Sequence, residues 1–403
     1  MSREELLKHL TSKAADVEDR YQEWAEHRAR CPFEKVEATD PILSTGASRY
    51  DASTAGDVYI AWRHDDVAHV MRDSDHFMKP GPPWRKTKTL LSMNGPEHLQ
   101  YRALLETALA PRAMAQVERD VIAPVMNRLI DGFAGRGSAE LIAEFTSHFP
   151  FHVIRTMIGF PESDHEEFIS LAYPGHGGLN AEWEVRVATF LRPRLEAARN
   201  DPQEDFLGYL VRAEVDGHPL NDEEIYQYLL LLIPAGADTT FAGTSNMFAG
   251  LLLHPDQFDL VRHDDGLVPR AVDEAIRWNN PAAASFLRRA TSDTELAGTV
   301  LPAGTTVSAH LSAHNRDAAK YADPDTFCVT RDRPPRGIFG YGPHACLGMH
   351  LARAEMRTAL RLAIRRLRNL RLDPDQPRPI VRADLGFPSP AALHVLFEPE
   401  QRD

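Results

Sequence analysis

The chain has 403 residues, of which 43% are hydrophobic and 26% are charged, and its formal net charge at pH 7 is −13. These fractions are those of an ordinary globular protein and exclude a disordered or collagen-like chain. The negative charge argues against a nucleic-acid-binding protein, because the phosphate backbone would repel the chain as a whole.

The first residues and the cysteines indicate the compartment. Residues 1–24 are too charged for a signal peptide, and no run of eighteen apolar residues could span a bilayer. Three cysteines occur, Cys31, Cys328 and Cys346, and they are widely spaced. This pattern suits a reducing compartment better than a disulfide framework. We therefore expect a cytoplasmic protein that binds neither membrane nor nucleic acid.

The apolar pattern predicts a mainly helical fold with a smaller β-rich region, an α+β architecture in one domain of residues 1–403. A short strand is expected at residues 57–62. Helical periodicity dominates from Pro111 to Arg277. Its longest stretch, residues 222–255, would form a helix of about 50 Å at 1.5 Å per residue, which predicts a central buried helix.

Strand-like runs reappear within residues 294–309, on either side of Gly298 and of the turn that ends at Gly304. Turn-rich segments interrupt the helical pattern at residues 79–84 and 173–180. Both are candidate lids, because loops on a rigid scaffold carry binding function, although the sequence by itself favours plain surface connections.

The long helical pattern contains an unusual polar turn, AGADTT, at residues 235–240. Burying an acid and two alcohols in an apolar helix is costly unless they have partners or a task. The Thr239 hydroxyl can bond back to the carbonyl of Ala235 and bend the helix. Pro234 lacks an N–H and frees a further carbonyl. A loosened turn is expected here.

A second unusual segment, FGYGPHACLG at residues 339–348, places Cys346 just before an amphipathic helical pattern. Helix N-terminal N–H groups and the helix dipole favour the thiolate form of such a cysteine. Gly340, Gly342 and Gly348 remove side chains that would keep a flat ligand away from the backbone.

Other interpretations of this segment are weaker. A structural zinc site needs four ligands, and His344 and Cys346 have no second pair nearby. A nucleophilic cysteine would need a histidine base, and the turn holds His344 apart from it. The formal G-x-G-x-x-A match lacks a β-α-β frame. An inert buried cysteine in a glycine-rich turn remains the alternative.

The segment resembles the haem-binding signature of the cytochrome P450 family, Phe-x-x-Gly-x-His-x-Cys-x-Gly, with every fixed position filled. The resemblance extends from about residue 55 to residue 398 and matches the first fifty residues poorly. It implies the cytochrome P450 fold, with haem b held between the long central helix and the cysteine loop. Cys346 would be the iron ligand, and Phe339, Gly340 and Gly348 would adjoin the cofactor.

The resemblance also implies partners for the haem propionates, because buried carboxylates without partners are costly. The family's His-x-x-x-Arg helix matches His98 and Arg102, and its arginine before the next strand matches Arg288 rather than Arg289. His344 would be the fourth donor. A second set of residues would form a structural ion cluster and take no part in catalysis: Glu274, Arg277 and Arg331.

Residues 235–240 resemble the family's Ala-Gly-x-Asp/Glu-Thr-Thr motif. By this match Asp238 would supply the acid and Thr239 the alcohol that deliver protons to bound dioxygen, with Thr240 in support. Ala235 and Gly236 would leave space above the iron.

The implied activity is that of a haem-thiolate monooxygenase that inserts one oxygen atom from dioxygen into a C–H bond of a hydrophobic small molecule. The chain is too short for a flavin or iron–sulfur module, so electrons would come from a ferredoxin and its NAD(P)H-dependent reductase. We expect a monomer. Arginines recurring every four residues after the ligand form either a dock for an acidic ferredoxin or a solvated helix face: Arg353, Arg357, Arg361 and Arg365.

Two alternatives remain from the sequence. A peroxygenase of the same haem-thiolate type would take hydrogen peroxide directly and would not need Asp238 and Thr239. A non-catalytic haem sensor or carrier would need no proton relay. The pocket walls are expected from residues 79–91, 173–180, 233–237, 281–286 and 386–390. They are mostly small or apolar and favour a terpenoid, an aromatic compound or a natural-product intermediate.

Overall fold

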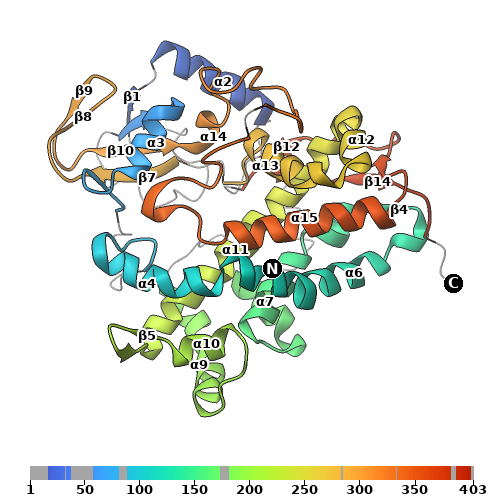
Figure 1. The fold of residues 1–403 in the computed structure, drawn as a ribbon, viewed down its shortest axis with the longest axis horizontal. Coiled ribbons are helices and arrows are strands. Elements are labelled where there is room, and N and C mark those ends of the chain that lie inside the picture. Colours follow the sequence, from blue (N-terminus) through green and yellow to red (C-terminus); the bar gives the residue numbers. More distant parts are fainter. Residues whose placement is uncertain are drawn as a thin grey trace.

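A computed structural model describes residues 17–31, 33–37, 58–80, 89–172, 181–282, 285–332, 334–382 and 387–400. Helices fill one side of the molecule, and a five-stranded sheet with short helices lies on the other (Figure 1). The predicted mainly helical fold with a smaller β region is confirmed. Within the described residues, no helix is long and apolar enough to cross a membrane.

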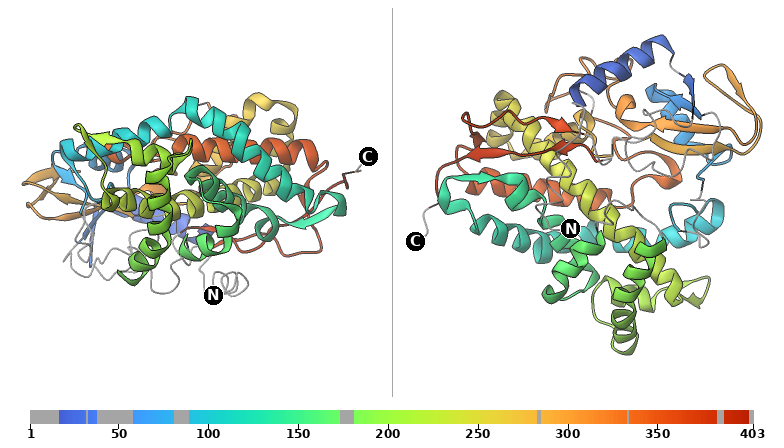
Figure 2. Two further views of the ribbon diagram at one scale, coloured as in Figure 1. Left: turned by 90° about the horizontal axis from the view of Figure 1, so that it is seen from below. Right: turned by 180° about the vertical axis from the view of Figure 1, so that it is seen from behind.

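The long helix α11 (Asp222–Leu253) crosses the helical side and packs on α7 (Phe149–Ile158), α13 (Val268–Trp278) and α15 (Met349–Arg366) (Figure 2). It starts at a capping box, in which the Asn221 side chain accepts from the Glu224 N–H and the Glu224 carboxylate accepts from the Asn221 N–H. Every residue from 240 to 252 is buried, as expected for a helix that is apolar all round. The predicted central helix ends two residues early.

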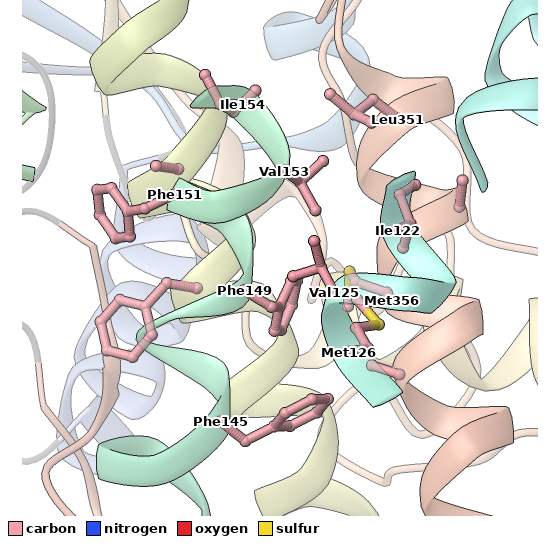
Figure 3. Close-up of a cluster of buried hydrophobic side chains, with 14 of the residues drawn as sticks. Ile122, Val125, Met126, Phe145, Phe149, Phe151, Val153, Ile154, Leu351 and Met356 are labelled. Atoms are coloured by element: carbon pink, nitrogen blue, oxygen red, sulfur yellow. The ribbon is translucent and has the colours of Figure 1, made fainter. Parts of the chain in front are cut away.

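The main core lies where α7 faces α6 (Ala123–Asp131), the π-turns η3 (Glu118–Ile122) and η5 (Ile142–Thr146), and α15. Figure 3 shows the side chains that converge there from these elements, all of them buried: Ile122, Val125, Met126, Phe145, Phe149, Phe151, Val153, Ile154, Leu351 and Met356. This packing fixes α15 against the rest of the helical side.

The five-stranded sheet has the order β1-β2-β10-β7-β3. Its strands are β1 (Phe33–Val36), β2 (Val58–Ala61), β10 (Thr306–His310), β7 (Ser285–Ala290) and β3 (Phe77–Met78). Strand β10 runs parallel to β2 and antiparallel to β7. The helices α3 (His64–Arg72) and α14 (Leu311–His314) contact each other, and α3 also packs on β10.

The strands predicted near residues 57–62 and 294–309 are confirmed. The second region forms the hairpin of β8 (Thr294–Leu296) and β9 (Thr299–Leu301), followed by β10. Ala297 and Gly298 both have positive φ, 51° and 78°, as a two-residue hairpin turn of the primed type requires.

The other elements complete the chain. The remaining α-helices are α2 (Val17–Arg30), α4 (Gly95–Ala108), α5 (Pro111–Val117), α8 (His165–Ala172), α9 (Ala181–Asn200), α10 (Phe206–Arg212) and α12 (Pro255–His263). Short 3-10 turns are η4 (Ala134–Arg136), η6 (Glu162–Asp164), η8 (Asp265–Leu267) and η9 (Gly342–His344). Short strands are β4 (Ser138–Glu140), β5 (Glu214–Val215), β6 (His218–Pro219), β11 (Arg371–Leu372), β12 (Val381–Arg382), β13 (Ser389–Pro390) and β14 (His394–Leu396).

A buried ion cluster joins α13 to the segment that leads toward Cys346. The Glu274 carboxylate accepts from Arg277 Nε at 2.7 Å and Nη2 at 2.8 Å, and from Arg331 Nη2 at 3.2 Å. Cys328, at a position where the resembled family often has aspartate, donates its backbone N–H to the same carboxylate at 2.9 Å. The predicted cluster of Glu274, Arg277 and Arg331 therefore exists.

Candidate active site

The loop that carries Cys346 closes on itself before α15 begins. The Cys346 N–H donates to the Phe339 carbonyl at 2.9 Å, and the Ala345 N–H donates to the Gly342 carbonyl at 3.0 Å. Gly348 is the residue that precedes α15, so Cys346 lies two residues before the helix cap, as predicted. Of the three cysteines, Cys346 is exposed while Cys31 and Cys328 are half-buried.

The thiol of Cys346 departs from one expectation. Its pKa is raised, because surrounding protein atoms strip water from the thiolate. The hydrogen bond from the Gly348 backbone and the charges of Arg102 and Arg353 oppose this effect without overcoming it. The predicted stabilisation of the thiolate by the helix N-terminus is therefore opposed by desolvation in the bare protein. A metal cation bound to sulfur would supply the missing positive charge, since a coordinating thiol is deprotonated.

The glycines of the loop have different roles from those expected. A Cβ at Gly342 would overlap the backbone of Met71 at the end of α3, and one at Gly340 would lie 2.9 Å from the Met71 side chain. Both have positive φ, 67° and 79°. Their small size thus lets the loop pack on α3. Gly348 has open space where its Cβ would point, which fits the predicted approach of a flat group.

The four basic residues that were predicted to bind the haem propionates come together from three distant segments. His98 and Arg102 share one face of α4 and are buried, at 1% and 9% exposure. The His98 ring stacks on that of His344 with centroids 4.1 Å apart. Burial, together with the charges of His98, Arg288, Lys79 and Arg102, lowers the pKa of His344 to about 2.

Burial agrees with the choice of Arg288 over Arg289. On β7 the Arg288 side chain points inward and is 2% exposed, whereas Arg289 is exposed. Burial lowers the pKa of Arg288 to about 10.

Neither ring nitrogen of His98 has a hydrogen-bond partner among the described residues. Because buried polar groups are normally hydrogen-bonded, this imidazole is suited to bind a ligand oxygen or a water molecule.

Lys79 is a fifth basic group that sequence reasoning placed only in a candidate lid. Burial and the charge of Arg288 lower its pKa to about 7, and its Nζ lies 5.6 Å from the centroid of the Phe286 ring. Lys79 and Arg288 lie close together, and Arg102 pairs with Glu106 at 2.7 Å. A cluster of basic side chains suits the carboxylates of a haem, so the donor set fits this cofactor.

The polar turn of α11 is also arranged as the sequence predicted. The Thr239 hydroxyl donates to the Ala235 carbonyl at 2.8 Å. Ala235 is exposed in the middle of the longest helix, which agrees with space on that side of the turn. Gly236 does not share this space, because a Cβ there would lie 2.5 Å from Ile154 Cδ1. The absent side chain instead lets α11 pack closely on α7.

Glu355 on α15 is a second residue that sequence reasoning missed as part of the site. It is fully buried, and neither carboxyl oxygen has a hydrogen-bond partner among the described residues. Burial raises the pKa of Glu355 well above its usual range, while the nearby Thr240 hydroxyl acts in the opposite sense. A buried carboxyl group with a raised pKa thus lies beside the last residue of the AGADTT turn. In the sequence, Glu355 is noticeable only as an acidic residue within an arginine-rich helix.

The arginine stripe on α15 is largely paired inside the chain. Arg353 binds Asp273 at 2.8 Å, and Arg361 binds Asp265 at 2.9 Å. Arg353 also lies over the Phe339 ring, 4.8 Å from its centroid. Arg357 and Arg365 make no ion pair with any residue the structure describes. The stripe therefore offers less unpaired charge than its spacing indicated.

Several expected pocket walls lie outside the described residues. These are residues 81–88 of the first candidate lid, the whole of residues 173–180, and residues 283, 284 and 386.

Comparison with known proteins identifies the class to which this fold and site belong. The family model "Cytochrome P450" matches residues 185–395. The steroid C26-monooxygenase of Mycolicibacterium smegmatis is 30% identical over 392 residues, covering 93% of this chain and 94% of that protein. Cytochrome P450-terp of a Pseudomonas species is 30% identical, covering 74% of each chain.

A solved structure, CYP108D1 from Novosphingobium aromaticivorans, superposes with a TM-score of 0.83 at 26% identity and covers 95% of each chain. The chain belongs to the cytochrome P450 family. It is therefore a haem-thiolate monooxygenase, an oxidoreductase that incorporates oxygen and uses haem as its cofactor.

Proposed function

We propose that this enzyme hydroxylates a C–H bond of a hydrophobic small molecule, with Cys346 as the thiolate ligand of haem b. The single observation that carries the proposal is the accessible Cys346 thiol beside a cluster of basic side chains from α4, β7 and its own loop. Haem with a thiolate ligand supplies the activation of dioxygen, and the chain positions it and controls protons.

In this proposal His98, Arg102, Arg288 and His344 hold the propionates, and Lys79 adds a cation. Arg288 is nearly inaccessible, and no acid faces it among its described contacts, so a propionate would relieve a buried charge. Phe339 and Gly348 would lie against the cofactor, and Gly340 would act through the turn it forms. The whole chain would form one haem domain.

Proton delivery would use Asp238 and Thr239 on α11, with Thr240 in support. The Thr239 hydroxyl already bonds to the Ala235 carbonyl, so it keeps its oxygen free to accept. Thr240 would link this turn to the buried carboxyl group of Glu355. This pair of acid and alcohol favours a monooxygenase over a peroxygenase and over a haem carrier, neither of which needs it.

The substrate class rests on similarity. The relative from Mycolicibacterium smegmatis is named for a steroid, and the expected walls of this chain's pocket are mostly small or apolar. Electrons would come from a ferredoxin and an NAD(P)H-dependent reductase, and Arg357 and Arg365 are the arginines of the stripe best suited to meet an acidic partner. We expect a monomer in a reducing, cytoplasmic setting.

The ligand assignment is tested with Cys346→Ser and the matched control Cys328→Ser. Cys328 is half-buried, and its Sγ lies 3.6 Å from Thr330 Oγ1. We expect Cys346→Ser to lose the strongly red-shifted absorption band of the reduced carbon monoxide complex and Cys328→Ser to retain it. An unchanged spectrum of Cys346→Ser would show that another group binds the iron.

The reaction is tested with Thr239→Ala, supplied with NADPH and a surrogate ferredoxin and reductase. We expect this variant to keep the red-shifted band, to consume NADPH, and to divert electrons to hydrogen peroxide in place of product. Equal product from hydrogen peroxide alone in wild type and Thr239→Ala would favour the peroxygenase. Absence of product from every candidate substrate, with a normal spectrum, would favour the sensor or carrier.

A further inference from the structure

Tyr341, in the Cys346 loop, packs into the buried core on the β side of the molecule. It lies between Gly340 and Gly342 and is 8% exposed. The Arg72 guanidinium covers one face of its ring, 4.3 Å from the centroid. A Cβ at Gly337 would overlap the ring, so that glycine makes room for it. The ring is therefore held on both sides.

The Tyr341 hydroxyl meets two histidines that stack on each other. His314 Nε2 lies 2.9 Å from the hydroxyl, and His64 Nε2 lies 3.1 Å from it. The two imidazole rings are 4.3 Å apart and 13° from parallel. His64 starts α3 and His314 ends α14, so one hydroxyl ties the loop to two elements of the β side.

The direction of these hydrogen bonds follows from His314. Its Nδ1 lies 3.1 Å from the Leu311 carbonyl, which can only accept, so Nδ1 carries the proton. Burial lowers the pKa of His314 to about 3, and the neutral ring therefore offers Nε2 as an acceptor. The hydroxyl therefore donates its proton to His314 Nε2. A neutral His64 ring carries one proton, which can serve either its Nε2 contact with the hydroxyl oxygen or its Nδ1 contact with Asp65, but not both.

Other contacts hold the two histidines in register. The His64 backbone N–H donates to Asp317 Oδ2 at 2.9 Å, and its Nδ1 lies 3.1 Å from Asp65 Oδ1, which also pairs with Lys320 at 2.8 Å. The Arg336 carbonyl, 3.3 Å from the Tyr341 hydroxyl, is a longer alternative acceptor. Every strong contact of the hydroxyl thus comes from outside the loop.

We infer that Tyr341, His64 and His314 form a positioning triad that fixes the loop carrying Cys346 and so preserves its bond to the iron. The inference rests on the proposed function, because it takes Cys346 as the ligand. Tyr341 lies five residues before Cys346, and the Cys346 N–H is itself bonded within the loop, to Phe339. Any shift of Tyr341 is therefore passed to the sulfur through a short, closed segment. None of the three side chains touches substrate or cofactor in this scheme.

The test is the rate at which haem-loaded protein loses the red-shifted band of its reduced carbon monoxide complex on mild heating. Tyr341→Phe keeps the ring and the Arg72 contact and removes only the hydroxyl. We expect its band to decay about tenfold faster than that of wild type, as the loss of one buried hydrogen-bonded group predicts. His314→Gln retains an acceptor and should decay within about threefold of wild type, whereas His314→Leu should match Tyr341→Phe.

The matched control is Tyr228→Phe. The Tyr228 hydroxyl is equally buried and donates to the Tyr101 carbonyl at 2.8 Å, but it lies on α11 and does not touch the loop. We expect Tyr228→Phe to lower the unfolding midpoint as Tyr341→Phe does and to leave the band decay unchanged. If Tyr341→Phe yields too little loaded protein, His64→Gln carries the same comparison.

Two outcomes would overturn the inference. One is a wild-type decay rate for Tyr341→Phe, and the other is an acceleration no greater than that of Tyr228→Phe. Failure of the ligand assignment itself gives a different result, because Cys346→Ser would then keep the band in the first place.

Discussion

Replacing Glu274 by glutamine is the sharpest test of what holds the segment before Cys346 in place. The Glu274 carboxylate is 1% exposed and is shared by Arg277 and Arg331. Arg277 is 0% exposed and also donates to the carbonyls of Asn315 and Pro324, at 3.1 and 2.7 Å. The change leaves two guanidinium groups with no carboxylate where water cannot replace it.

The size of the effect follows from this burial. Removing one partner of a buried ion pair typically costs about 3–5 kcal/mol, because an uncompensated charge stays in the interior. Glutamine keeps the shape and one acceptor, so we expect Glu274→Gln to lie near the lower end, at about 3 kcal/mol. That is a large part of the roughly 5–15 kcal/mol by which folded domains are stable.

Asp273→Asn is the control, because Asp273 is the neighbouring acid on α13. It pairs with Arg353 at 2.8 Å, and the two side chains are 23% and 27% exposed. Water screens this pair, so we expect a loss of about 1 kcal/mol or less. Urea unfolding followed by circular dichroism, with haem content measured in parallel, compares the variants. A difference below about 1 kcal/mol between Glu274→Gln and Asp273→Asn would refute the reasoning.

Three further predictions concern acid stability, the loop and the propionate cluster. Burial lowers the pKa of His310 to about 3. Between pH 6.5 and about 3, this side chain therefore binds a proton in the unfolded chain but not in the folded chain. Stability should fall by about 1.4 kcal/mol per pH unit in that window on this account, and the urea midpoints of His310→Asn should show a shallower fall than wild type. Gly342→Ala should lose haem, because its Cβ would meet the backbone of α3, whereas Gly217→Ala, with a similar φ of 77° and no atom within 4 Å, should cost only about 1 kcal/mol. Arg288→Ala should release haem to apomyoglobin at least about tenfold faster than Arg289→Ala, and equal rates would exclude Arg288 as a propionate partner.

The sequence alone was sufficient wherever the signal lies in the spacing of neighbouring residues. The apolar run from 222 to 255 predicted α11 to within two residues of its end. The contiguous match around Cys346 predicted the family. The inward alternation of β7 agrees with the choice of Arg288 over Arg289, since neighbouring residues of a strand face opposite sides.

What the sequence could not supply depends on how distant segments meet. Lys79 joins the basic cluster because β3 pairs with β7, and the pKa of Glu355 is raised because α15 packs against α11 and buries the carboxyl group. A charge far apart in sequence from its partner gives no local pattern, so neither residue stood out. The acids that neutralise Arg353 and Arg361 come from α13 and η8 for the same reason.

The thiol of Cys346 and the glycines mark the boundary between the two kinds of information. Position along the chain determined that Cys346 precedes a helix and that Gly236 is small. Only the tertiary structure decided that surrounding atoms raise the pKa of the Cys346 thiol, and that Gly236 faces Ile154. The covalent chain fixes the local order of groups, whereas desolvation and close contact are properties of the atoms that folding brings around them.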